Sequence, residues 1–102
     1  MIHQNWSELV REHFTNQIPR LPNVGDSVSG KVVACAPFGI WLDINYGIPA
    51  LLEIIQLDYQ KYHPEHYPEC TPDIDEEMDA FIVAITNKEI RLTQNFIFKK
   101  HT

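Results

Sequence analysis

The chain has 102 residues, 44% of them hydrophobic, and a formal net charge of −6. This length suits one domain with an extension, and such a domain can bury a core without disulfides or metal. No run approaches the roughly 18 consecutive apolar residues of a membrane span, so no membrane partner is expected. Two cysteines, Cys35 and Cys70, cannot form a disulfide framework, and no secretion signal is apparent. The expected location is therefore the cytoplasm.

The N-terminal part predicts an amphipathic helix over residues 5–17. Its apolar side chains and one histidine recur at helical spacing, which places them on one face: Trp6, Leu9, Val10, His13 and Phe14. The segment "IPRLPNVGD" then ends the helix with prolines and glycine. We assign residues 1–23 to a helical extension whose apolar stripe must pack on something, most naturally a sheet.

From Ser27 the hydrophobic period changes to two, which indicates strands. The pattern predicts five strands, at residues 27–35, 38–44, 48–55, 78–85 and 89–93. A long connection separates the third strand from the fourth. Five short strands with this spacing predict an all-β protein, a five-stranded OB-type barrel over residues 24–95 with the helix in front and a tail at 96–102. A sandwich could use similar strands.

The second predicted strand presents an unusual tryptophan. Ile40, Leu42 and Ile44 share one face of the strand, so Trp41 shares the opposite face with Asp43. A tryptophan on a polar face is not expected in the core. It either lies under another part of the chain or is open to a partner.

Four motifs in order resemble the S1-type RNA-binding domains: "VGDSVSGKV", "FGIWLDI", "GIPALLEIIQL" and "IRLT". This resemblance implies an OB barrel that binds single-stranded RNA across one face. Phe38 and Trp41 match the two aromatic residues on which the family stacks bases. The chain departs from the family at the third strand, where Glu53 replaces a histidine, and after the last strand, where a basic residue is missing.

The leading hypothesis is a non-enzymatic domain that binds single-stranded RNA through an exposed aromatic platform. Phe38 and Trp41 would stack bases, because stacking on exposed rings tolerates any base. Lys31 and Arg91 would contact the RNA backbone. Gly39 would leave room for a flat ligand. This hypothesis requires that the N-terminal helix covers the bottom of the barrel, since a helix over Trp41 would block RNA.

The rival hypothesis is a protein–protein interaction module on an OB scaffold that has lost RNA binding. Residues 56–80 hold eight carboxylates and one lysine, so the acidity of the chain belongs to one segment. This segment could dock a basic partner protein, or it could simply be a solvated connection.

No cofactor, metal or catalytic centre is expected. His63, His66 and Cys70 lie close in sequence, but no fourth histidine or cysteine follows at a distance typical of zinc sites. No nucleophile, P-loop or dinucleotide motif gives the carboxylates a catalytic role.

Overall fold

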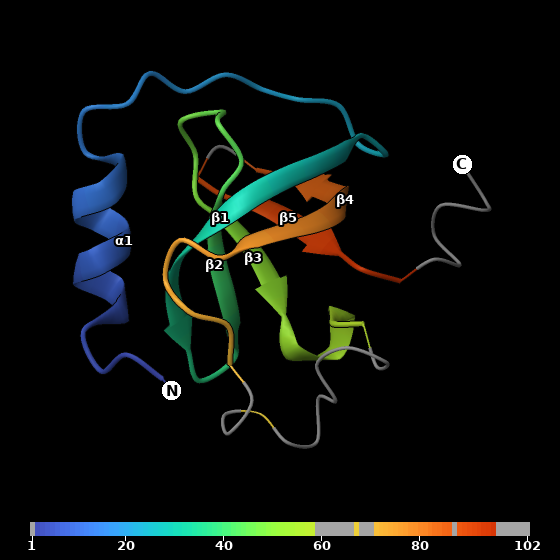
Figure 1. Ribbon diagram of the computed structural model, residues 1–102. Helices are drawn as coiled ribbons and strands as arrows, with labels where there is room; N and C mark the ends of the chain where they lie inside the picture. Colours follow the sequence, from blue (N-terminus) through green and yellow to red (C-terminus); the bar gives the residue numbers. More distant parts are fainter. Residues whose placement is uncertain (1, 59–66, 68–70, 87, 96–102) are drawn as a thin grey trace.

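The computed structural model describes residues 2–58, 67, 71–86 and 88–95. Figure 1 shows the N-terminal helix beside a small barrel. The elements in chain order are α1 (Trp6–Phe14), β1 (Ser27–Ala36), β2 (Gly39–Asp43), β3 (Ala50–Glu53), the 3-10 turn η1 (Ile54–Gln56), β4 (Glu77–Ile85) and β5 (Ile90–Thr93). In this part of the chain, no helix is long and apolar enough to cross a membrane.

The strands form a closed barrel in the order β1-β2-β3-β5-β4. β3 and β5 run parallel, whereas the other neighbouring strands are antiparallel. The predicted all-β, five-stranded OB-type barrel with an N-terminal helix is therefore confirmed. The third strand is shorter than expected, because the chain turns into η1 directly after Glu53.

The barrel interior contains the inward side chains that the alternating pattern predicts. The largest of them are at most 1% exposed: Val32, Ile40, Leu42, Leu52, Ile82, Ile90 and Leu92. Gly30 lies where β1 leaves β2 and pairs with β4. A Cβ atom there would lie 2.7 Å from the backbone oxygen of Asp43, so only glycine allows this close approach.

A second, smaller apolar cluster lies outside the barrel, between α1 and the wall made by β1, β2 and β3. Val10 of α1 is buried there against Val33, Trp41 and Leu51. Ala34 and Ala36 of β1 are fully buried in the same cluster, and their small side chains let the helix approach the sheet closely. The expected helix thus packs on a sheet, and Figure 1 shows it along the β1–β2 side of the barrel.

Candidate functional site

The expected aromatic platform lies beneath the edge of α1, which packs mainly on β1 and also buries the outward side chains Trp41 of β2 and Leu51 of β3. The Trp41 side chain points outward from the barrel as predicted, but it is only 9% exposed. The Trp6 ring of α1 stacks on it, with the ring centroids 6.2 Å apart and the planes 12° from parallel. The expectation of an exposed Trp41 is wrong, because the apolar stripe of the helix and the indole bury each other.

Phe38 lies in the turn between β1 and β2 and remains 40% exposed. Its ring meets Trp6 edge-on at 5.1 Å and Trp41 edge-on at 6.2 Å between centroids. Trp6, Phe38 and Trp41 therefore form one aromatic cluster. Phe38 is the exposed member of this cluster, and one partly exposed phenyl ring is a small surface for stacking bases.

The indole nitrogen Nε1 of Trp41 is buried and has no hydrogen-bond partner among the described residues. An unsatisfied buried N–H group costs about 1–3 kcal/mol. Burial of the two large rings outweighs this cost, since a buried aromatic side chain removes a large apolar area from water.

Polar contacts fasten both ends of the helical segment to the barrel. Near the start, the backbone N–H of His3 donates to the Cys35 carbonyl at 2.9 Å, and Cys35 N–H donates to Nδ1 of His3 at 3.0 Å. Near the end, Nε2 of His13 lies 2.7 Å from Oδ2 of Asp43 on β2. Burial would raise the pKa of Asp43, but hydrogen bonds from His13, the Asn45 N–H and Gln17 outweigh it and lower the pKa.

Arg91 on β5 is held by two carboxylates. Its guanidinium donates to Glu53 at 2.7 Å and to Glu89 at 3.0 Å. The hydrogen bond to Glu89 is the main reason why the pKa of Arg91 is raised. Glu53, the residue that departs from the family pattern, thus neutralises the base expected to meet RNA phosphates.

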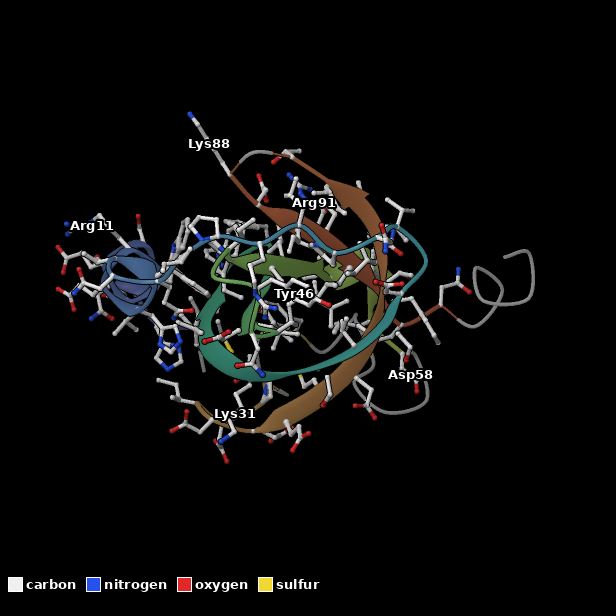
Figure 2. The ribbon with its side chains drawn as sticks, turned by 90° about the horizontal axis from the view of Figure 1, so that it is seen from above. Arg11, Lys31, Tyr46, Asp58, Lys88 and Arg91 are labelled. Carbon is white, nitrogen blue, oxygen red and sulfur yellow. The ribbon has the colours of Figure 1, made fainter. Side chains whose placement is uncertain are left out.

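Lys31 lies on a different wall of the barrel. In the strand register, it is paired with Asp43 of β2 and with Glu77 of β4. Figure 2, which looks along the barrel, shows Lys31 and Arg91 on opposite sides, with carboxylate oxygens around Lys31. The structure therefore brings Phe38 and Trp41 together, but it does not gather them with Lys31 and Arg91 into one surface.

Gly39 has a role different from the one expected. A Cβ atom at this position would lie 2.6 Å from the Leu52 carbonyl oxygen and 2.8 Å from the Glu53 Cα. The missing side chain lets the backbones of β2 and β3 approach, rather than leaving room for a flat ligand.

His63, His66 and Cys70, where no metal site is expected, lie outside the described residues. Within the described ranges, no group of three or more potential metal ligands is found.

Comparisons with known proteins agree on the fold. No family model matches the chain, and no curated protein matches its sequence. The uncharacterised protein MJ1198 from Methanocaldococcus jannaschii superimposes with a TM-score of 0.59 at 14% identity, over 72% of this chain and 93% of that one. GSP13 from Bacillus subtilis gives a TM-score of 0.56 at 15% identity, over 82% and 61%.

A third similar structure is a protein described provisionally as an exosome complex RNA-binding protein. Its TM-score is 0.60 at 21% identity, over 76% of this chain and 46% of that protein. The chain therefore spans less than two thirds of GSP13 and of this protein. At these identities the likeness shows the shared barrel fold alone.

The residues that cover Trp41 are recognisable in the sequence, but the surface on which the helix packs is not. Trp6 and His13 belong to the stripe at helical spacing, and strand alternation puts Asp43 on the same face as Trp41. A stripe at helical spacing indicates that a helix packs on a surface, without indicating which surface. No sequence pattern indicates a role for Tyr67, whose hydroxyl lies within hydrogen-bond distance of the carbonyls of Ala36 and Gly39, beside the turn that holds Phe38.

Proposed function

We propose that this protein is a non-enzymatic, cytoplasmic binding module on an OB scaffold, and that its partner is a basic protein. The observation that carries this proposal is the position of α1. OB barrels bind oligonucleotides on the strand 2–3 face, and here two outward side chains of that face, Trp41 and Leu51, are buried under the helix of the same chain. The Trp41 ring, which would stack on a base, therefore stacks on Trp6 of the same chain.

The charges support a basic protein partner over RNA. The described part of the acidic segment exposes Asp73, Asp75, Glu77 and Asp79, at the start of β4 and just before it. Arg91 is engaged by Glu53 and Glu89, so a phosphate would have to compete with two carboxylates already in place. An acidic surface attracts a basic protein and repels a phosphate backbone.

The test is a pull-down with the intact protein from nuclease-treated and from untreated lysate. We expect the same basic proteins in both samples and no RNA in the untreated one. Loss of the proteins after nuclease treatment, or recovery of RNA with the untreated protein, would contradict the proposal.

A second candidate function, binding of single-stranded RNA with α1 displaced, is favoured by one observation. The Trp6 ring lies nearly parallel to the Trp41 ring, as a stacked base would, and the Trp41 N–H group has no partner among the described residues. A ligand that replaced Trp6 could stack on Trp41 and accept this hydrogen bond. One structural neighbour is described as RNA-binding, which agrees with this candidate.

Two substitutions of one residue separate these candidates. Trp6→Ala removes the stacked ring, whereas Trp6→Phe keeps an aromatic ring in its place. We would titrate both variants and the unmodified protein with a labelled oligouridine of about 12 nucleotides, a length within the site sizes of OB folds, at low salt. The displaced-helix candidate predicts weak binding by the unmodified protein and by Trp6→Phe, and tighter binding by Trp6→Ala. Absence of binding in all three proteins would exclude it.

A further inference from the structure

A groove runs along one side of α1, separate from the aromatic cluster. Its volume is about 440 Å³, and its walls come from α1, the middle of β1 and the segment that leads into β4. This volume lies in the range of roughly 300–1,000 Å³ that is typical of ligand sites. The groove can therefore hold a few side chains of a partner, but not a whole secondary-structure element.

One part of the groove lining is apolar. Leu9 of α1, Val33 of β1 and Ile74 line it from three separate segments. Ile74 is 45% exposed, although isoleucine is among the residues most often buried. An aliphatic side chain seated here would remove apolar surface of Ile74 and Leu9 from water.

The other part of the lining is acidic. Asp43, Asp75 and Glu77 contribute carboxylates, and Lys31 contributes the positive charge between them. Asp43 is already engaged by His13, which also lines the groove, and Glu77 accepts a hydrogen bond from Ser29 at 2.7 Å. Asp73, Glu76 and Asp79 lie beside Asp75 and Glu77 in the sequence and add further negative charge. Negative charge therefore exceeds positive charge at this site.

We infer that this groove binds an extended basic segment of a protein partner, in which an arginine lies next to an aliphatic residue. The guanidinium would donate to Asp75 and Glu77, since arginine is suited to binding carboxylates with several N–H groups. The aliphatic neighbour would pack on Leu9 and Ile74. This inference rests on the proposed function and names its site. A nucleic acid does not fit, because its phosphates would face carboxylates.

Conservative variants remove the acidic contacts without disturbing the backbone. Asp75 has a positive φ of 70°, a conformation that asparagine also tolerates, so Asp75→Asn keeps the local structure. Glu77→Gln keeps an oxygen that accepts the hydrogen bond from Ser29. The matched control is Asp73→Asn with Asp79→Asn, which removes the same charge from neighbouring positions that do not line the groove.

The probe is a short fluorescent peptide in which arginine alternates with leucine, with binding measured by anisotropy on the intact protein. Loss of two charge-assisted hydrogen bonds predicts that Asp75→Asn with Glu77→Gln weakens binding about tenfold or more. The control pair should change the affinity by less than about twofold. Equal weakening by both pairs would contradict binding in the groove, because the affinity for the peptide would then depend on net charge alone.

The apolar contact is tested by Ile74→Ser together with a second peptide in which serine replaces leucine. Ile74→Ser should weaken binding of the arginine–leucine peptide and leave the arginine–serine peptide unchanged. Equal effects on both peptides would contradict the apolar contact. If no peptide binds while the nuclease-resistant protein partners persist, the groove fails and the proposed function stands. If the protein retains RNA and no proteins, the proposed function fails.

Discussion

Glu53 shows how one side chain changes the use of a surface. It lies on β3 beside β5, and its carboxylate is 2.7 Å from a guanidinium nitrogen of Arg91. Alone, Glu53 would make this wall negative and repel RNA. Arg91 alone would make it positive and attract RNA. Together with Glu89 they form a partly exposed ion-pair network that leaves little positive charge for a phosphate.

The close approach at Gly39 predicts a loss of stability in Gly39→Ala. The added methyl carbon would lie 2.6 Å from the Leu52 backbone oxygen, so β2 and β3 must move apart. We expect the free energy of unfolding to fall by about 1–3 kcal/mol, the usual cost of overpacking. Urea denaturation measures this change. A Ser7→Ala control on the exposed side of α1 should leave stability nearly unchanged, and an equally stable Gly39→Ala would refute the backbone argument.

The lowered pKa of Asp43 predicts a dependence of stability on acidic pH. A carboxyl whose pKa is lower in the folded state stabilises the protein above its unfolded pKa, near 3.8. This contribution is lost as pH falls below that value. Asp43→Asn should therefore cost about 1–2 kcal/mol at pH 7 and progressively less in acid.

The measurement is the urea midpoint of both proteins over a series of pH values down to the acid range. Asp73→Asn, at an exposed position, serves as the control. A difference between Asp43→Asn and the unmodified protein that stays constant with pH would show that the pKa of Asp43 does not differ between the folded and unfolded states.

At the scale of elements, α1 owes its stability to the barrel. A helix from Trp6 to Phe14 is shorter than the roughly 12–15 residues that isolated helices need in water. Val10 is buried against Trp41 and β1, and His13 adds a polar contact to β2. These contacts all lie on the wall of β1 to β3. If this packing is lost, α1 should therefore detach and Trp41 should become exposed at the same time.

Fluorescence tests this coupling, because the chain has two tryptophans. In both Trp6→Ala and Trp6→Phe, Trp41 is the remaining emitter. We expect Trp6→Ala to cost about 2 kcal/mol, less than for a fully buried ring, and to shift the emission of Trp41 to longer wavelength with stronger quenching by acrylamide. Trp6→Phe should keep a buried emission. The same spectrum in both variants would show that Trp6 does not hold α1 against Trp41.

At the scale of the whole molecule, the sequence predicted the barrel better than its outer surface. Alternation located Ile40, Leu42 and the other inward residues, because one face of each strand must be buried. The contacts that fasten the helix beside Trp41 and that neutralise Arg91 join residues far apart in the chain. His13 meets Asp43, and Glu53 meets Arg91, across separations of 30 and 38 residues. Local patterns contain no information on such pairs until the strand order and the position of the helix are known.

The uneven charge of the molecule predicts a salt effect on stability. Asp79 is exposed on β4, near Glu77 and the acidic residues before it, so like charges repel on that wall. Two variants each make the net charge less negative by one: Asp79→Asn within this wall, and Asn16→Lys in the exposed turn after α1. At low salt, Asp79→Asn should raise the urea midpoint more than Asn16→Lys does. High salt should reduce the difference, since screening weakens repulsion between exposed charges. Equal gains from both variants would mean that total charge, rather than its concentration beside β4, limits the stability of this protein.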